Sequence, residues 1–175
     1  MSKILLVTGP GGAGKSTACG LFADSVSGTW ALIEQDEIRR QVKAGFKNPS
    51  EYPWTDEMQK QWDVSIEICA DIATRYKNVG ISCIIDCFAA SKSFDKWEKA
   101  LQGLDYQVVV LLPEEDETVR RNNQRSGEAK LKESQIREHH EWFAMWRDDK
   151  RVKIIDTTNY SIDEVVEELT NLAHE

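Results

Sequence analysis

A glycine-rich turn near the beginning of the chain constrains the fold more strongly than any other feature. Residues 9–16 read Gly-Pro-Gly-Gly-Ala-Gly-Lys-Ser, an apolar run (residues 3–8) leads into them, and a helical pattern (residues 14–26) overlaps their end. Glycine tolerates positive φ angles and lets backbone N–H groups approach a ligand closely. The helix adds its unbonded N-terminal amides and the positive end of its dipole. A strand, a glycine-rich loop and a helix in this order predict a binding site for phosphate groups.

The spacing within this loop fits the Gly-x-x-x-x-Gly-Lys-Ser/Thr pattern of a P-loop. We predict that Lys15 bridges the β- and γ-phosphates of ATP as a catalytic residue, and that the Ser16 hydroxyl is a ligand of Mg²⁺. ATP and Mg²⁺ are therefore the expected cofactors. The loop residues predicted to bind the nucleotide are Gly11, Gly12, Ala13, Gly14, Lys15, Ser16 and Thr17.

Short apolar runs and helical patterns alternate along the whole chain. The runs are residues 3–8, 30–34, 81–86, 106–112 and 152–156; the helical patterns are residues 14–26, 36–44, 55–79, 91–101, 114–150 and 161–173. Strands that alternate with helices in this way predict βαβ units with right-handed crossovers. We expect an α/β fold in three layers, a single domain over residues 1–175, with a five-stranded parallel sheet and helices on both faces.

Helical spacing also predicts which side chains face the core. In the first helix these are Ala18, Leu21, Phe22 and Ser25, and in the long helix they are Met58, Trp62, Ile66, Cys69, Ile72 or Ala73, and Tyr76. The four cysteines (Cys19, Cys69, Cys83 and Cys87) form no Cys-x-x-Cys pair. We interpret them as buried, reduced thiols.

A first candidate for the phosphoryl acceptor site follows the second apolar run. Asp36 comes just after the carboxyl end of this strand, where ligands of open α/β sheets bind. Its carboxylate could take the proton of an acceptor hydroxyl, which makes it a catalytic and substrate-binding candidate. Arg39 lies one turn further on and could hold the acceptor or the transferring group. The alternative is that Asp36 only caps a helix and Arg39 is solvated.

The third apolar run ends in a carboxylate as well. Ile84-Ile85-Asp86 resembles a Walker B sequence, in which the acid holds Mg²⁺ directly or through water. Asp86 could instead face the acceptor, and the sequence does not separate the two roles.

A pair of arginines in the charged segment after the fourth run predicts a lid. Arg121 and Arg125 are four residues apart and would project from one helix face. Arg121 could stack on adenine, and Arg125 could neutralise charge on the phosphoryl group in the transition state. The lid would cover about residues 114–147, with an interruption at Ser126 and Gly127 and a mobile part over residues 128–137. The alternative is a solvated charged helix.

Together these motifs resemble the small P-loop kinases of the zeta-toxin, polynucleotide-kinase and chloramphenicol-phosphotransferase type, more distantly related to shikimate, gluconate and adenylate kinases. Besides the motifs above, Ile-Asp-Thr-Thr before the last helix contributes to the likeness. The resemblance implies the strand order 2-3-1-4-5, a base or acceptor-anchoring role for Asp36, and a position near the adenine for residues 157–159, with Thr158 as the nucleotide-binding candidate. The acceptor-binding segment, about residues 36–78, matches no better-known member.

Several aromatic and histidine side chains have no assigned role in this resemblance. Tyr52, Trp54 and Trp62 either line an acceptor pocket or pack in the core. Trp142, Phe143 and Trp146 have helical spacing, which favours packing, and we interpret His139 and His140 as surface residues without a metal.

Charge and hydropathy narrow the function classes. A net charge of −8 disfavours nucleic acid as a partner, because phosphate contacts need clustered Lys and Arg. No apolar run is long enough to cross a bilayer or to serve as a signal peptide, so we expect a cytoplasmic protein without membrane contact, as a monomer or homodimer. The leading prediction is an ATP- and Mg²⁺-dependent kinase that phosphorylates a hydroxyl of a nucleoside, sugar or antibiotic-like molecule. The alternatives are a 5′-hydroxyl polynucleotide kinase and a nucleotide-dependent switch or ATPase without an acceptor.

Overall fold

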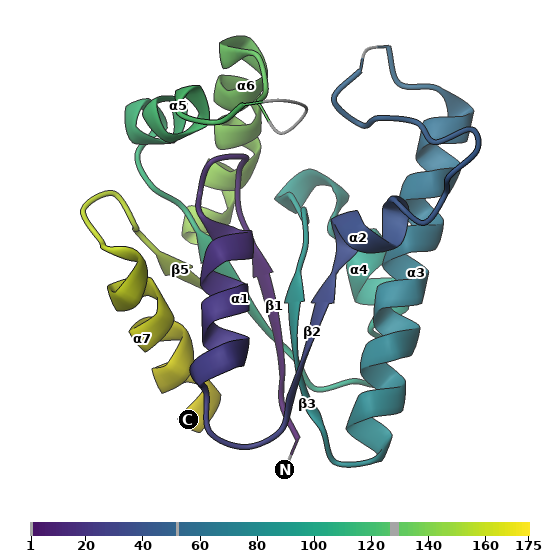
Figure 1. The fold of residues 1–175 in the computed structure, drawn as a ribbon, viewed down its shortest axis with the longest axis vertical. Coiled ribbons are helices and arrows are strands. Elements are labelled where there is room, and N and C mark those ends of the chain that lie inside the picture. Colours follow the sequence, from purple (N-terminus) through teal and green to yellow (C-terminus); the bar gives the residue numbers. More distant parts are fainter. Residues whose placement is uncertain (1, 52, 127–129) are drawn as a thin grey trace.

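Five parallel strands form the centre of the molecule (Figure 1). The computed structural model describes residues 2–51, 53–126 and 130–175. The sheet has the order β2-β3-β1-β4-β5, as predicted. Its strands are β1 (Ile4–Thr8), β2 (Trp30–Glu34), β3 (Ser82–Asp86), β4 (Gln107–Leu111) and β5 (Val152–Ile155).

Helices cover both faces of this sheet. Successive residues of the central strand β1 point to opposite sides, and all of them are apolar from Ile4 to Val7, so each face has side chains that a helix layer buries. Ile4 and Leu6 belong to the core that is shared with α3, α4 and α6, whereas Leu5 and Val7 belong to the core that is shared with α1 and α7. The helices are α1 (Lys15–Ser25), α2 (Gln35–Arg39), α3 (Asp56–Asn78), α4 (Asp95–Ala100), α5 (Glu115–Asn123), α6 (Glu133–Ala144) and α7 (Ile162–His174). In the part of the chain that the structure describes, short 3₁₀ helices cover Ser91–Ser93 and Met145–Asp148. The three-layer α/β prediction is therefore confirmed.

The register aligns the strand ends on which the site depends. Glu34 at the end of β2 pairs with Asp86 at the end of β3, and Asp86 pairs with Val7 of β1, two residues before the glycine-rich loop. The carboxyl ends of these three strands thus meet at one edge of the sheet, and both chain termini lie at the opposite edge (Figure 1).

Two helices differ from their predicted extents. The helix expected over residues 36–44 ends at Arg39, because the following residues are largely exposed and have no buried face to stabilise a longer helix. Within the described part of the segment 114–150, the helical residues form α5, α6 and a 3₁₀ turn instead of one element. The N-cap prediction at Thr55 is confirmed, since its hydroxyl accepts a hydrogen bond from the Met58 N–H at 3.2 Å. The expected lid interruption includes Gly127, and residues 127–129, like Tyr52, lie outside the described part of the chain.

Some core assignments need correction. Leu21, Ser25 and Tyr76 are exposed, because each lies at the flank of its helix, turned away from the sheet. Ala73 is fully buried, whereas Ile72 is only partly buried. All four cysteines are buried and free, and burial raises the pKa of Cys69 to about 12 and that of Cys83 to about 11. Within the described residues, no helix is both long and apolar enough to span a bilayer.

Candidate active site

The glycine-rich loop connects β1 to α1 and lies at the upper edge of the sheet in Figure 1. The Ala13 N–H donates to the Pro10 carbonyl at 3.2 Å, which closes the loop into a tight turn. Gly12 has a φ of 94°, and a Cβ atom there would lie 2.8 Å from the Thr118 carbonyl oxygen of α5. Glycine is therefore required at this position both for the backbone angle and for the approach of α5.

The two reactive side chains of the loop lie at the N-terminus of α1. Lys15 Nζ donates to the carbonyls of Gly9 and Pro10, at 2.9 and 3.2 Å, which holds the ammonium beside the loop. Ser16 and Thr17 are exposed in the first turn of the helix. This arrangement directs a cation, a hydroxyl and the positive end of a helix dipole to one point, as the binding of a phosphate chain requires.

Asp86 lies next to these groups, at the end of β3. Its side chain is buried, and burial raises its pKa, an effect that Lys15 and a hydrogen bond with Ser16 oppose. The pKa of its strand neighbour Glu34 is also raised, by burial and then by the charge of Asp86. The sequence analysis assigned no role to Glu34. The signal that could have found it is an acidic residue at the end of a strand, two residues before the candidate Asp36.

The donor set fits Mg²⁺. Among the described residues, no three His, Cys, Asp or Glu side chains form a metal cage by themselves. Mg²⁺ is a hard cation that proteins usually bind through one or two carboxylates, with phosphate oxygens and water as the remaining ligands. Ser16 and Asp86 supply a hydroxyl and a carboxylate at the mouth of the loop, so both metal candidates lie together.

Asp36 and Arg39 form an ion pair at the start of the acceptor segment. Arg39 donates to Asp36 Oδ1 at 2.6 Å; its side chain is 6% exposed, whereas that of Asp36 is 64% exposed. The guanidinium also lies 4.9 Å from the Trp62 ring centre and 5.7 Å from that of Phe46. The alternative of a solvated Arg39 is therefore wrong, because two aromatic rings and a carboxylate enclose its charge. Asp36 stays accessible to a ligand.

Gln35, a buried residue that sequence reasoning missed, fixes α2 against the rest of the site. Its amide N–H donates to Ser65 Oγ of α3 at 3.0 Å, and its oxygen accepts from the Phe88 N–H at 3.1 Å. The bonds tie the segment that carries Asp36 to the segment that follows Asp86. The only signal in the sequence is a glutamine directly before the candidate base Asp36. Its burial and its two partners, which are remote in sequence, do not follow from that position.

The arginines of the lid have different surroundings. Arg121 donates to Glu117 at 2.6 Å and to the carbonyls of Thr157 and Thr158 at 2.7 and 3.4 Å. The structure thus brings together Arg121 and Thr158, the two predicted nucleotide-binding residues outside the loop. Arg125 is near enough to Asp86 for its charge to lower the pKa of that carboxyl. The alternative of a wholly solvated charged helix is wrong for Arg121, whose contacts join α5 to the loop after β5.

The segment predicted as a lid covers the glycine-rich loop and reaches the segment predicted to bind the acceptor. A Cβ atom on Gly11 would lie 3.0 Å from Leu131 Cδ1 and 3.3 Å from Ile136 Cδ1, so both apolar side chains rest on the loop. Asn122 holds the lid chain in place, since its side chain bonds the N–H and the carbonyl of Leu131 at 3.1 and 2.9 Å. Gln135 donates to the Ser50 carbonyl at 2.8 Å.

The two histidines of α6 are not surface residues, which corrects the sequence-based interpretation. His140 is buried, and its Nε2 lies 3.0 Å from the Pro113 carbonyl oxygen. His139 lies against Phe88 and Trp142, with ring centres 4.9 and 5.0 Å apart. Burial, then the charges of Lys15 and Lys92, lowers the pKa of His139 to about 4. Both are drawn inward because α6 packs against residues that follow two strands: Phe88 after β3 and Pro113 after β4.

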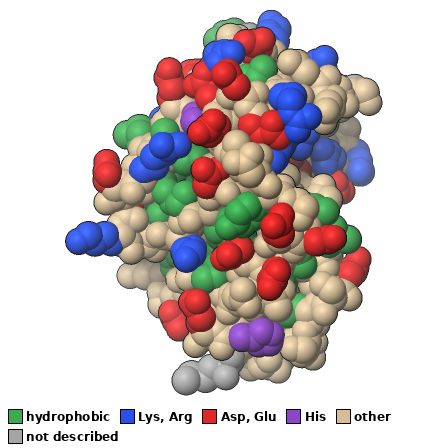
Figure 2. Space-filling view, turned by 90° about the vertical axis from the view of Figure 1, so that its left-hand side faces the viewer, with side chains coloured by type: hydrophobic (Ala, Val, Ile, Leu, Met, Phe, Trp, Pro, Cys, Tyr) green, Lys and Arg blue, Asp and Glu red, His purple; other side chains and the backbone are tan. Residues whose placement is uncertain are grey.

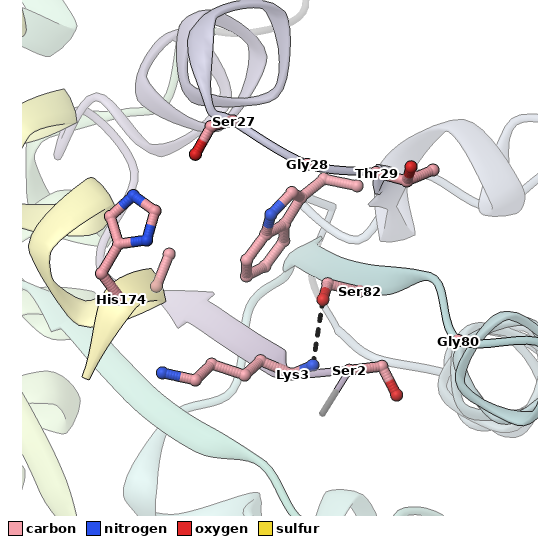
Figure 3. A pocket seen from close by; sticks show the side chains of 10 residues that line it. Ser2, Lys3, Ser27, Gly28, Thr29, Gly80, Ser82 and His174 are labelled. Atoms are coloured by element: carbon pink, nitrogen blue, oxygen red, sulfur yellow. Dashed lines mark hydrogen bonds between the residues drawn. The ribbon is translucent and has the colours of Figure 1, made fainter.

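A hollow of about 430 Å³ lies at the opposite edge of the sheet, where the strands begin (Figure 3). It is lined by Lys3, Ser82 and His174 among others, and the Lys3 N–H donates to Ser82 Oγ at 3.0 Å. None of the predicted site residues lines it. The candidate active site is therefore the carboxyl edge.

Comparisons with known proteins agree with this geometry. Residues 4–149 match the family model described as an AAA domain. A comparison with curated proteins finds no match.

The solved structures that superpose over 98% of this chain include the following three. An unliganded sugar kinase from Janibacter sp. HTCC2649 has a TM-score of 0.68 at 19% identity, with 94% of that chain covered. A gluconokinase from Sinorhizobium meliloti 1021 has a TM-score of 0.67 at 23% identity and 94% coverage. The tunicamycin resistance protein of Deinococcus radiodurans has a TM-score of 0.71 at 17% identity and 95% coverage.

The resemblance inferred from the sequence is thereby confirmed at the level of family and fold. The matched family model covers the strands β1 to β4, the glycine-rich loop and the lid helices. The chain belongs to this AAA domain family, and its fold is that of the small P-loop kinases.

Proposed function

We propose that the chain transfers the γ-phosphate of ATP to a hydroxyl group of a small molecule, with Mg²⁺. The observation that carries the proposal is the convergence of Lys15, Ser16, Asp86 and Asp36 at one edge of the sheet, under a lid. A cation, a hydroxyl and a buried carboxylate suit a magnesium nucleotide, while the accessible Asp36 faces the segment that remains for a second substrate.

The reaction follows from these positions. The acceptor oxygen attacks the γ-phosphorus, its proton passes to the Asp36 carboxylate, and the bond from the γ-phosphorus to the bridging oxygen breaks to release ADP. Arg39 donates a hydrogen bond to Asp36 Oδ1 and so orients this carboxylate. Lys15 and Arg125 stabilise the negative charge that spreads over the phosphoryl oxygens. Bound Mg²⁺, held by Ser16 and Asp86, would neutralise charge on the β- and γ-phosphates.

The lid would exclude water from this reaction. Leu131 and Ile136 cover the loop with apolar surface, and Gln135 connects the lid to the acceptor segment. Exclusion of water strengthens the electrostatic contacts and prevents wasteful hydrolysis of ATP. Such a cover is useful to a kinase that must favour a hydroxyl acceptor over water.

Two observations bear on the class of acceptor. Solved structures with this fold include a sugar kinase, a gluconokinase and a tunicamycin resistance protein, which supports a sugar, nucleoside or antibiotic-like acceptor. On the face that carries α5, α6 and α7, acidic side chains lie from end to end, and basic ones lie among them over the upper part (Figure 2). This face and the net charge of −8 support a small molecule over a polynucleotide, whose binding needs a continuous basic track.

The test measures ADP release from ATP in the presence of a panel of sugars, nucleosides and hydroxylated antibiotics. We expect one class to increase the rate at least about 10-fold, which corresponds to a barrier lower by ~1.4 kcal/mol, and EDTA to abolish the increase. A 5′-hydroxyl oligonucleotide serves as a further arm, with binding measured at rising salt concentration. ADP release that no hydroxyl compound changes would indicate a switch or ATPase instead.

A further inference from the structure

A cluster of aromatic side chains lies beside the proposed catalytic carboxylates. Ring centres are 5.6 Å apart for Trp54 and Trp62, 6.0 Å for Trp62 and Phe88, and 6.4 Å for Phe88 and Trp142. His139 contacts the last two rings. The aromatic cluster is defined here as Phe46, Trp54, Trp62, Phe88, His139 and Trp142; it joins the acceptor segment, the end of β3 and the lid helix α6.

The aromatic cluster adjoins the chemistry directly. Phe88 follows Asp86 by two residues, and Arg39, the ion-pair partner of Asp36, lies over the rings of Phe46 and Trp62. The charge of Lys15 reaches His139 strongly enough to lower its pKa. A molecule against these rings would therefore have its hydroxyl groups close to the γ-phosphate position.

The rings of the cluster differ from those of the core. Phe143 and Trp146, on the same segment as His139, are at most 1% exposed. Trp54 is 38% exposed, and Trp62, Phe88 and Trp142 are only partly buried. Partly exposed aromatic rings that meet in one place are typical of a surface that binds an apolar ring face.

Cations beside the cluster already have partners. Arg39 is paired with Asp36, Lys96 is paired with Asp63 at 2.6 Å, and the Lys92 ammonium lies 3.0 Å from the centre of the Trp142 ring. An anionic acceptor would have to displace one of these contacts. The charge pattern thus favours an uncharged molecule.

One polar atom in the cluster lacks a partner. Among the described residues, His139 Nδ1 is a buried side-chain nitrogen without a hydrogen-bond partner. A buried polar atom in this state is unfavourable, and a ligand hydroxyl would satisfy it. His139 is on the lid, so this contact would couple acceptor binding to lid position.

We propose that the aromatic cluster is the acceptor site, that it binds an uncharged, hydroxylated ring compound such as a neutral sugar or nucleoside, and that His139 Nδ1 accepts a hydrogen bond from it. The inference rests on the proposed kinase function. It names the acceptor class of that site: a neutral ring that lies against the aromatic cluster, rather than a sugar acid or a nucleotide.

The first test uses matched acceptor pairs that differ by one charged group: glucose with glucuronate, and adenosine with AMP. We expect the neutral member of at least one pair to stimulate ADP release about 10-fold more than its charged partner. If only the charged members accept phosphate, the kinase function stands and the acceptor inference is wrong. If ATP binds but no compound of either kind accepts phosphate, the proposed function is wrong as well.

The second test uses variants of His139 with the best acceptor. His139→Leu should raise the acceptor KM about 10-fold and leave the ATP KM unchanged, whereas His139→Asn, whose oxygen occupies the Nδ1 position, should stay within about 3-fold of the wild type. Trp142→Leu should raise the acceptor KM likewise. Trp30→Leu, a partly buried tryptophan at the other edge of the sheet, is the matched control.

Protection from thermal unfolding by MgADP verifies that each variant folds and binds nucleotide. Equal increases in the KM values of ATP and acceptor, or no change in either, would overturn the role of His139. An unchanged acceptor KM in both His139→Leu and Trp142→Leu would remove the aromatic cluster from the acceptor site.

Discussion

The carboxyl and amino edges of the sheet are built from the same strands and have opposite electrical character. At the carboxyl edge, α1 begins at Lys15 and presents N–H groups to the glycine-rich loop. At the amino edge, α7 ends and its Leu172 carbonyl accepts from Lys3 Nζ at 3.5 Å. Parallel connections place helix N-termini at one edge and C-termini at the other, so the first edge attracts anions and the second attracts cations.

The contrast shows which edge of such a fold suits the binding of a nucleotide. The hollow at the amino edge contains a lysine, hydroxyls and a histidine, yet among the described residues no helix there begins beside a glycine-rich turn (Figure 3). The carboxyl edge combines buried Asp86 and Arg39 with an enclosed loop. The same residue type should therefore affect turnover and nucleotide binding at the carboxyl edge but not at the amino edge. Pairs of variants, one at each edge, measure this difference.

The largest effect is expected for Asp36→Asn. It removes the carboxylate proposed to take the acceptor proton but keeps the shape of the side chain, so turnover should fall about 10²- to 10⁴-fold while ATP affinity is unchanged. Steady-state kinetics and nucleotide titration measure the two quantities. Turnover near the wild-type value would remove Asp36 from the mechanism.

A pair of lysine variants compares the two edges directly. Lys15→Ala should lower turnover about 10²- to 10³-fold, because one preorganised contact to the transferring phosphoryl group is lost. Lys3→Ala, which removes an equal charge at the amino edge, should leave turnover unchanged. Equal effects of the two variants would contradict the electrical asymmetry of the sheet.

The pH dependence of unfolding compares one histidine at each edge of the sheet, His139 and His174. The pKa of His139 is lowered to about 4 in the folded protein, while the unfolded chain binds the proton near pH 6.5. Stability should therefore fall as the pH drops from about 6.5 to 4, by about 3 kcal/mol from this residue.

Urea unfolding at a series of pH values measures this loss. His139→Asn should remove it, and His174→Asn, on the exposed end of α7, should retain it. A wild-type curve parallel to that of His139→Asn would show that His139 is not held neutral by the fold.

The smallest effect compares two glycines with positive φ. Gly12→Ala should destabilise the fold by about 2–3 kcal/mol and weaken nucleotide binding, because its Cβ would meet the Thr118 carbonyl at 2.8 Å. Gly80→Ala, at a φ of 82° with nothing within 4 Å, should cost only about 1 kcal/mol and leave nucleotide binding intact. Equal losses would mean that the contact with α5 does not restrict the loop.

The elements that depend on neighbouring residues alone could be predicted from the amino-acid sequence. The glycine-rich loop is a run of eight residues. The strand before it follows from an apolar run, and the helix after it follows from helical spacing. The strand-end position of Asp86 and the placement of Asp36 followed in the same way, because each acid comes directly at or after a buried strand. The strand order came from the resemblance and is confirmed.

The way in which distant segments complete the site became visible only in the folded protein. Arg39 is enclosed by Phe46 and Trp62, and Gln35 bonds Ser65 and Phe88. The helix α6 brings His139 against Phe88, two residues after β3. The charged residues around His139 predict an exposed position, because helical spacing shows only which residues share a face of the helix. His139 is held instead by Phe88, which lies more than forty positions earlier in the chain, and local sequence preferences do not reveal such a contact.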